Sequence, residues 1–490
     1  MKSPLLSLNN ILWVMMVIFL PITSFPLLSK ILGGINVAPL SLVFLIPLLL
    51  IWLIPNFIKG QGLPSQSVPL LIFILLALIS SLAAFYLQIP SFKAKVVWQN
   101  EFGEIISLGI GFCFFLITSL WINNFNKLDN FFRLVNISGA VALAYTLIQG
   151  FFVIIIHETP VNLLAFQNFL SASQILFVNR VNGLTFEPSW LAHQLNLFYL
   201  PIWLGLSIRK ITFHKFHFMK LTFENILLIT GFIALFLTFS RIGWLACFAY
   251  CGYCSLRFMN SIRCKILTKV VKQPLNIFSL KELLFNLGFW FLLLLILIAS
   301  LSFVGYISTK LDKRMVDLFY FQGIKEWGLL GWTGKLVFAE RIVYWIAGYG
   351  TFIKHPLIGV GLGNSGFFFP QTINSFGYSL IDIIRILVDN SYLPNIKNLW
   401  IRLLAETGIV GFSLFVSWLW VVWKTARTLE NLPENLSKAI GIMGKITIIG
   451  LIVEGFSIDT FALPYFWCSL GLVVAAFRIF SKKQQSGKTN

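Results

Sequence analysis

HPLIGVGLGNSG, at residues 355–366, stands in the segment around which the rest of the chain is arranged. This segment, residues 310–411, separates two long apolar runs and holds nine Lys and Arg before Asn398. It is too polar to cross a bilayer. A helical pattern begins at Glu340, and the His-Pro pair ends it before the glycine-rich turn. The fold is therefore decided by the apolar runs on either side.

Those apolar runs predict an all-α polytopic membrane protein. The chain has 490 residues, of which 58% are hydrophobic and 11% charged, more apolar surface than a soluble core could hide. Most runs have the roughly 17–25 residues of a membrane-spanning helix, not the alternating pattern of barrel strands. We expect a single integral membrane domain, residues 1–490, with about twelve spans at 11–29, 36–55, 68–88, 104–122, 134–156, 189–207, 224–240, 242–256, 284–307, 399–423, 441–458 and 462–479. The seventh and eighth spans, 224–240 and 242–256, could also form one broken helix.

The net charge is +19, and the distribution of Lys and Arg along the chain predicts how the chain is oriented in the membrane. With both termini in the cytoplasm, the inward segments hold 21 Lys and Arg, against five in the short outward segments. By the positive-inside rule this places the large loop, residues 308–398, outside, with short amphipathic helices in it, and residues 481–490 inside as a tail. We interpret the first apolar run as a span and not as a removed signal peptide. The basic charge is therefore a topology signal with some attraction for membrane lipids, and we expect no nucleic-acid partner.

The spacing of the cysteines does not indicate a metal-binding site. Four of the six cysteines lie close together along the chain, but no histidine accompanies them, and zinc sites need paired ligands on a turn. We interpret them as small apolar side chains at a helix end. We expect no metal and no cofactor.

Three arginines on the outward side are the first candidates for chemistry. Arg180, Arg241 and Arg341 stand close to apolar runs, where a guanidinium costs roughly 2.5–3.5 kcal/mol at a helix centre. A planar fork of donors suits the oxygens of a diphosphate. The alternatives are snorkelling at the interface or structural pairing with Glu187 or Glu340.

Two carboxyl groups are the candidates for accepting a proton. Glu187 and Glu406 lie near the ends of apolar runs, where burial raises a carboxyl pKa and arginines lower it. A structural salt bridge is the alternative for both. His193 and His355 are interpreted as structural groups or helix stops.

The glycine-rich turn matches the pattern G-x-G-x-x-G over Gly361, Gly363 and Gly366. A dinucleotide site needs a preceding strand in a parallel sheet, and here a helix and Pro356 come first. We therefore reject the cofactor interpretation. A tight turn that allows close backbone approach is expected, with amides facing an anion.

Four motifs in a consistent order carry a family resemblance. They are Asn179-Arg180-Val-Asn-Gly183-Leu-Thr-Phe-Glu187-Pro188, Ser240-Arg241-Ile-Gly-Trp244, Arg341 followed by His355-Pro356-Leu-Ile-Gly359-Val-Gly361-Leu-Gly363-Asn364, and the segment from Asn398 to Gly411. The ordered set, with one large outer loop before the tenth span, resembles the O-antigen ligase and O-antigen polymerase family of bacterial envelopes. The resemblance extends over about residues 179–411.

This resemblance implies a metal-independent glycosyltransferase at the outer face of the bacterial inner membrane. It would take glycan from an undecaprenyl-diphosphate-linked oligosaccharide and pass it to a lipid-linked acceptor, with flippase and chain-length regulator proteins as further partners. The resemblance implies that Arg180, Arg241 and Arg341 hold the diphosphate, and from the charge of its side chain we expect Lys397 to bind the diphosphate with them. We predict Glu187, Arg341 and Glu406 as catalytic residues, and we expect His355, Gly361, Gly363, Asn364 and Asn398 to serve substrate binding or loop geometry.

One position departs from the family pattern. Ligases carry a His-Asn pair, nine further residues and then Gly-x-x-Gly, whereas this chain keeps the spacing from Asn398 to Gly408 and Gly411 but has Lys397 in place of the histidine. A lysine holds phosphate more readily than it accepts a proton. We therefore favour an O-antigen or exopolysaccharide polymerase over a ligase. A polytopic transporter of lipid-linked glycan or a small anion remains the alternative from another class.

Overall fold

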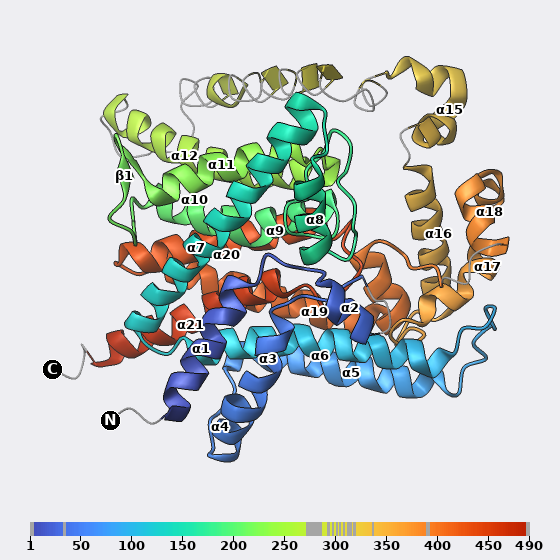
Figure 1. The fold of residues 1–490 in the computed structure, drawn as a ribbon, viewed down its shortest axis with the longest axis horizontal. Helices are drawn as coiled ribbons and strands as arrows, with labels where there is room; N and C mark the ends of the chain where they lie inside the picture. Colours follow the sequence, from blue (N-terminus) through green and yellow to red (C-terminus); the bar gives the residue numbers. More distant parts are fainter. Residues whose placement is uncertain are drawn as a thin grey trace. The chain divides into compact units, whose positions relative to one another are not determined.

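A computed structural model describes residues 4–32, 36–270, 320–335, 338–388 and 393–486, with residues 287–291 and a few positions between 295 and 316. These residues are mainly helical, with one small antiparallel hairpin, β1 (His217–Phe218) and β2 (Leu221–Thr222) (Figure 1). They fall into two compact units, residues 1–247 with 343–490, and residues 248–342.

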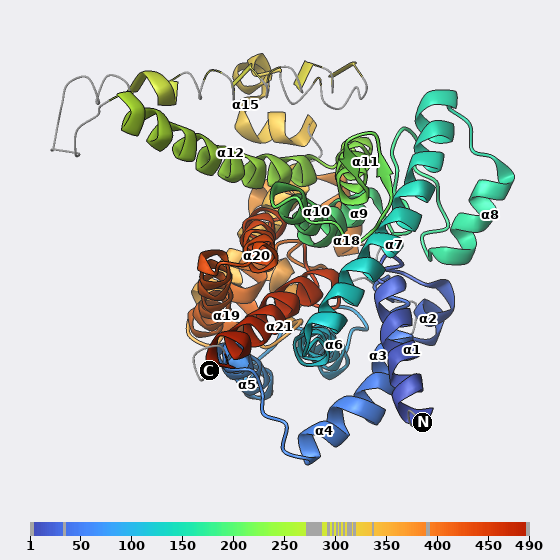
Figure 2. The same cartoon turned by 90° about the vertical axis from the view of Figure 1, so that its left-hand side faces the viewer.

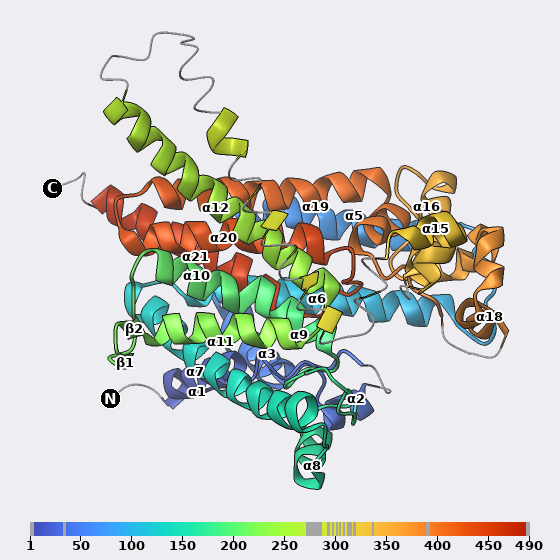
Figure 3. The same cartoon turned by 90° about the horizontal axis from the view of Figure 1, so that it is seen from above.

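Among the described residues of the first unit, six helices are long and apolar enough to cross a membrane. They are Ser65–Ala84 (with α5, Val68–Ala84), α6 (Val97–Trp121), α7 (Phe125–Gly150) with its π-helical extension η3 (Phe151–Ile156), α19 (Leu399–Asn431), α20 (Asn435–Glu454) and α21 (Pro464–Ser486). The all-α, multi-pass membrane fold is thus confirmed. Helix α19 packs against α5, α20 and α21, and α21 packs against α6 (Figures 1 and 3).

Several other predicted spans form shorter or broken helices, so the number twelve stays a prediction. The predicted span 36–55 is α3 (Leu42–Leu48), η1 (Leu49–Leu53) and α4 (Ile54–Ile58), and the span 189–207 is α9 (Pro188–Gln194), η4 (Leu195–Tyr199) and α10 (Leu200–Ile208). Helices α11 (Phe223–Leu237) and α12 (Arg241–Val270) are separate helices, because Phe239 between them adopts a positive φ of 47°. The chain is therefore interrupted at residues 238–240, between the two predicted spans.

The prediction of one span over residues 11–29 is wrong. Helix α1 (Pro4–Ile18) ends early, and Pro21 follows, which lacks an amide proton and restricts φ. The chain then forms a bridge between Ser24 and Ala38 before the short helix α2 (Pro26–Ile31). Figure 2 shows α1, α2 and α3 on one side of the bundle.

The segment 308–398 contains short helices, as expected, wherever the structure describes it. The second unit holds most of α12 and α15 (Gln322–Lys335), which is kinked at Gly328. Helix α16 (Ala339–Lys354) continues into the first unit, where α17 (Phe369–Thr372) and α18 (Ile381–Val388) follow. The predicted span 284–307 lies mostly outside the described residues. At the other terminus α21 stays helical to Ser486, so the described part of the expected tail continues that helix.

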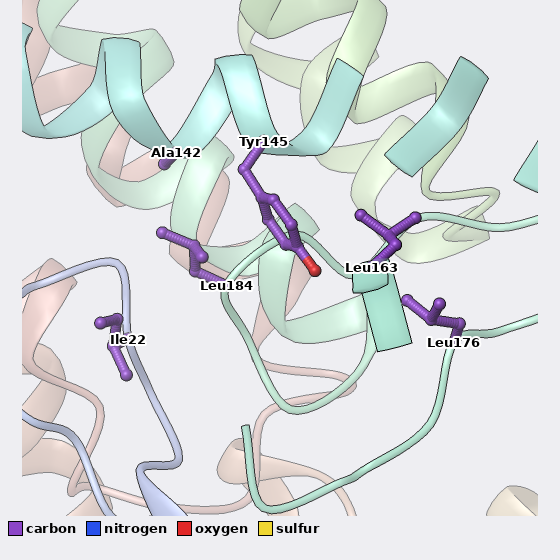
Figure 4. Close-up of a cluster of buried hydrophobic side chains, with 6 residues drawn as sticks. All are labelled: Ile22, Ala142, Tyr145, Leu163, Leu176 and Leu184. Atoms are coloured by element: carbon purple, nitrogen blue, oxygen red, sulfur yellow. The ribbon is translucent and has the colours of Figure 1, made fainter. Parts of the chain in front are cut away.

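A small apolar cluster fixes the loop before α9. Figure 4 shows Tyr145 pointing from α7 between Leu184 and Leu163, with Leu176 nearby. The Tyr145 hydroxyl donates a hydrogen bond to Gln167 Oε1 at 2.7 Å, within α8 (Val161–Leu170). Because two of these leucines flank residues 177–183, the cluster anchors the loop that carries Arg180.

Candidate functional site

The loop at residues 179–187 is held against α7 by one buried amide side chain. Gln149 Oε1 accepts hydrogen bonds from the amides of Asn182 (3.0 Å) and Gly183 (2.8 Å), and its Nε2 donates to Asn182 Oδ1 (2.6 Å). Gly183 has a φ of 54°, a conformation that glycine adopts without strain. The Asn-Gly pair of the first motif thus forms a fixed turn.

That turn brings the backbone at Arg180 against the connection that carries Arg241. Arg180 Nε donates to the carbonyl oxygen of Thr238 at 2.9 Å, and the next amide, Val181, donates to Leu237 O at 3.2 Å. Arg241 follows three residues later as the first residue of α12, and both arginines are half buried. Two of the three predicted arginines therefore lie at the same connection, that between α11 and α12. Arg341 belongs to the second unit, so its approach to the other two stays a prediction.

Glu187 is the N-cap residue of α9 and is half buried. Its Oε1 accepts a hydrogen bond from the Ser189 hydroxyl. The Glu187 side chain makes no hydrogen bond to the first amides of α9, but the helix dipole favours a negative charge at this position. The side chain is thus fixed at the start of α9 and is in part accessible.

His193 of α9 and Glu454 of α20 form a buried imidazole–carboxylate pair. Neither residue was predicted as part of the site. His193 Nδ1 is 2.6 Å from Glu454 Oε2, and the two residues are 2% and 0% exposed. Asn196 Nδ2 donates both to Glu454 Oε1 (2.6 Å) and to Gly243 O (2.8 Å), which ties α20 to the start of α12. The sequence could have indicated Glu454, because a glutamate in an apolar helix needs a partner for its charge.

A buried hydroxyl lies near both this pair and Glu187. Tyr465, at the start of α21, is 0% exposed and lies within electrostatic reach of both Glu454 and Glu187. The carboxyl groups of Glu187 and Glu454 therefore belong to one polar region at the junction of α9, α20 and α21.

The glycine-rich stretch packs against a break in α19. Gly408 has φ 64° and ψ −172°, which interrupts the helix and frees carbonyls and amides on both sides of it. The freed carbonyls of Ala405 and Glu406 accept the amides of Val360 and Gly361, each at 3.0 Å. The amides of Ile409 and Val410 in turn donate to Pro356 O (2.8 Å) and Leu357 O (3.3 Å). The third and fourth motifs thus form one backbone-paired unit.

Close approach explains the first glycine of this stretch. A Cβ on Gly359, whose φ is 71°, would lie 2.4 Å from the carbonyl carbon of Glu406. Ser80 of α5 contacts both backbones, because its hydroxyl lies within hydrogen-bond distance of Ile358 O (2.5 Å) and Glu406 O (2.8 Å). Only glycine fits where the two backbones meet.

Glu406 is at the centre of a closed ion-pair cluster. Arg402 Nε lies 3.0 Å from Glu406 Oε2, and its Nη2 lies 2.7 Å from Glu104 Oε2 on α6. The remaining nitrogen, Nη1, donates to the backbone carbonyl of Asp459. Ser365, from the glycine-rich stretch, donates to Glu406 Oε1 at 2.8 Å. Arg402 and Glu406 are 3% and 2% exposed, so this cluster joins α6, α19 and the turn.

Asn364 and the last two glycines of the predicted site contact α6 as well. The Asn364 amide donates to Glu101 Oε1 and to Val360 O, and Asn100 donates to the Gly363 carbonyl. Gly361 and Gly363 adopt φ values of 87° and 78°, which explains why glycine stands at both positions.

The remaining predicted residues lie at the start of α19 and the end of α16. Asn398 is buried and caps α19, its Oδ1 accepting the amides of Trp400 (3.0 Å) and Ile401 (3.1 Å). Lys397 adopts a φ of 52°, and its Nζ lies 4.8 Å from the centre of the Tyr344 ring. His355 packs edge-on against Phe368, and partial burial, aided by the charge of Lys354, lowers the pKa of the imidazole.

These groups lie at one end of the bundle, which we name the Asn398 end. It is formed where α5, α20 and the described part of the outer segment finish and where α6, α9, α12 and α19 begin. The amide of Leu399 donates to Gly455 O at 2.7 Å, so the cap of α19 is adjacent to Glu454. Within the described residues, no three His, Cys, Asp or Glu side chains form a group suited to a metal ion.

Comparison with known proteins adds one finding. A family model described as O-antigen ligase matches residues 226–416. The matched part runs from α11 into α19 and includes the backbone-paired unit around Gly408, whereas the Arg180 loop precedes it. No curated protein gives a significant match.

Proposed function

From the relationship of residues 226–416 to the O-antigen ligase family, we propose that this multi-pass membrane protein transfers glycan between lipid-linked substrates. The donor is an undecaprenyl-diphosphate-linked oligosaccharide, and the acceptor is a sugar hydroxyl on a second lipid-linked glycan. Transfer takes place at the outer face of the bacterial inner membrane and makes an O-antigen or exopolysaccharide polymer. Nucleotide sugars are absent there, so a donor that carries its own diphosphate leaving group suits the reaction.

The single observation that supports this proposal is that Arg180 and Arg241 lie at the same connection, that between α11 and α12. Two guanidinium groups at one helix junction suit a diphosphate, because each can hold two oxygens and both are partly removed from water. The diphosphate gains negative charge as the glycosidic bond breaks, and the arginines stabilise this charge. We assign Arg341 and Lys397 to the same phosphate oxygens.

The reaction needs a proton acceptor beside the diphosphate. The acceptor oxygen forms a bond to the anomeric carbon, the bond from that carbon to the diphosphate oxygen breaks, and the hydroxyl proton passes to a base. We assign the base to Glu187, which is fixed at the start of α9 and partly accessible. Glu406 is held by Arg402 and Ser365, and we assign it to the geometry of the glycine-rich turn.

Two alternatives differ in product or class. A ligase would use the same donor but another acceptor, and the lysine at position 397, where ligases carry histidine, favours the polymerase. A transporter of lipid-linked glycan or a small anion is the second candidate function. It is favoured by the buried Glu454–His193 pair, since ionisable groups inside a membrane bundle mark proton or ion pathways in many transporters.

Reconstitution tests the proposal. Purified full-length protein in liposomes, given synthetic lipid-linked repeat units without metal or nucleotide, is expected to lengthen the glycan. Arg180→Ala and Arg241→Ala are expected to lower the rate by about a hundredfold or more, the usual effect of removing one group that stabilises the leaving charge. Lys95→Ala, which removes an exposed cation predicted on the same face, is the matched control.

The outcomes separate the candidates. Full chain growth in both arginine variants would contradict the diphosphate assignment. Movement of labelled lipid-linked glycan across the bilayer without chain growth would identify a transporter. Transfer of a single finished glycan to a lipid acceptor without repeats would identify a ligase.

A further inference from the structure

A cavity lies at the end of the bundle opposite to Asn398, where α5 begins and α19 approaches its C-terminus. Its volume is about 240 Å³. Ser65 and Gln66 line it from the start of the helix at residues 65–84, Lys424 and Thr425 from α19, and Phe477 from α21. None of these residues belongs to the candidate site described above.

The cavity lies at a membrane interface. Lys424 is 26 residues beyond Asn398, which corresponds to about 39 Å of helix at 1.5 Å per residue, against a hydrocarbon core of about 30 Å. Trp420, one turn earlier, is 56% exposed, and Lys424 Nζ lies 5.6 Å from the centre of its ring. Tryptophan and lysine together are typical of the level of the lipid headgroups. The charge distribution predicts that this is the cytoplasmic leaflet.

Hydrogen-bond donors of the cavity suit an anion. Among the described residues that line the cavity, Lys424 is the only charged one and none carries a carboxylate. Gln66 is 8% exposed, and its Oε1 accepts the Ser65 hydroxyl at 3.4 Å. No described residue accepts a hydrogen bond from its Nε2. The amide of Ser67 donates to Pro64 O at 2.9 Å and that of Val68 to Ser65 O, so the helix start contributes mainly its dipole, which favours negative charge at this point.

The other walls of the cavity are formed by an apolar side chain and by threonines whose hydroxyl groups already donate hydrogen bonds within α19. The hydroxyl of Thr425 donates to Val421 O at 2.8 Å, and that of Thr428 donates to Lys424 O at 3.1 Å, so both donors are used within α19. Phe477 adds an aromatic wall. Donors on one side and apolar groups on the other match a phosphate that continues into a hydrocarbon-bearing ester.

We propose that this cavity binds the phosphate headgroup of an anionic phospholipid from the leaflet on the Lys424 side. Its volume is below the roughly 300–1,000 Å³ of pockets for drug-sized ligands, which suits a headgroup and excludes a glycan chain. Lys424 and the Gln66 amide hold the phosphate oxygens, and the acyl chains lie along the exposed side of Trp420. A dissolved phosphate ion has the same binding chemistry and is the other source of the ligand.

Lipid retention by the full-length protein tests the site. The protein is purified in detergent, incubated with phosphatidylglycerol, and analysed by native mass spectrometry. Lys424→Gln is expected to bind phosphatidylglycerol about fivefold less, because a charge-assisted contact is lost. Arg427→Gln is the matched control: it removes an exposed cation at nearly the same depth that does not line the cavity, and binding is expected to remain unchanged.

Gln66→Leu provides a second test that leaves every charge in place. It keeps the side-chain bulk but removes the amide donor, so weaker binding with an unchanged melting temperature supports a built site. Equal losses in Lys424→Gln and Arg427→Gln would overturn the proposal in favour of general attraction between cations and anionic lipid. Displacement of the lipid by millimolar inorganic phosphate, with phosphate protecting the wild type from unfolding, would overturn the assignment to lipid.

Discussion

Gly408 interrupts α19 (Leu399–Asn431) and so determines how this helix contacts the glycine-rich stretch. Its φ and ψ lie in a region that is accessible almost only to glycine, and a Cβ there would lie 2.1 Å from the carbonyl oxygen of Leu357. Without this break, the carbonyls of Ala405 and Glu406 would be used inside α19 and could not accept the amides of the glycine-rich stretch. A single backbone conformation therefore joins two motifs that are about fifty residues apart.

We predict that Gly408→Ala destabilises the protein by about 3 kcal/mol or more, since backbone strain of about 1–3 kcal/mol adds to the overlap with Leu357. Thermal unfolding in detergent measures the change. Gly109→Ala is the control, because Gly109 lies in α6 with nothing within 4 Å of the added Cβ. Equal melting temperatures for the two variants would show that the break at Gly408 is not strained.

His355 gives a pH dependence whose sign follows from its surroundings. Burial, with Lys354 beside it, lowers the pKa of the imidazole in the folded protein below its ordinary value of 6.5. The unfolded chain then binds the proton more readily, so this group's contribution to stability is complete above pH 6.5 and is lost as the pH falls through the folded-state pKa. The packing of His355 on Phe368 is thus favoured by the neutral ring.

We predict that the melting temperature of the wild type falls more steeply than that of His355→Gln between pH 7 and pH 5. The variant has no group at this position that binds a proton in that range, so its curve is expected to be flatter. Parallel curves would show that the histidine titrates alike in the folded and unfolded chains.

At the scale of elements, α19 is fastened to α6 and to the glycine-rich turn by charge. Arg402 contacts Glu104 of α6, Glu406 of its own helix and the backbone of Asp459. Buried ion pairs add little net stability compared with apolar packing, but they are costly to break once they are formed. The cluster therefore specifies which helices pack together and how they are positioned relative to one another along the bundle axis.

We predict that Arg402→Gln lowers the free energy of unfolding by about 3–5 kcal/mol, because Glu406 is left buried without its partner. The double variant Arg402→Gln with Glu406→Gln is expected to recover part of this loss, since the buried negative charge is also removed. Unfolding by denaturant in mixed micelles measures both. Additive losses in the double variant would argue against direct coupling of the two side chains.

At the scale of the whole molecule, the distribution of Lys and Arg predicts how the bundle is inserted. The connection near Glu158 is expected outside, and the β1–β2 turn at Met219, which is 88% exposed, is expected in the cytoplasm. This orientation puts the Asn398 end, with Arg180, Arg241 and Glu187, on the outer face. It also puts the Lys424 cavity on the inner face.

We predict that alkaline phosphatase inserted after Glu158 is active in bacterial cells, whereas the same enzyme inserted after Met219 is inactive. The enzyme folds only outside the cytoplasm, because it needs disulfides that form there. A green fluorescent protein fused to the C-terminus is expected to fluoresce. Activity at Met219 together with inactivity at Glu158 would reverse the orientation and remove the outer-face assignment of the site.

Hydropathy alone was sufficient for the helical membrane fold, because the length and apolarity of each run follow directly from neighbouring residues. The order of the motifs was sufficient for the family resemblance, which the match to residues 226–416 bears out. Positive φ at Gly361 and Gly363 also agrees with the expectation of a tight turn there. The early end of α1 was missed because Pro21 lies inside an otherwise continuous apolar run.

The sequence by itself determined that the chain is a bundle of apolar helices and which residues would be costly to bury. The tertiary structure alone decided how that cost is met: Glu454 pairs with His193, 261 residues away, and Arg402 joins Glu104 of another helix to Glu406. Periodicity describes only one helix at a time. The partner of a buried charge depends on which helices pack together and at what height, and that is settled by the packing of the whole bundle.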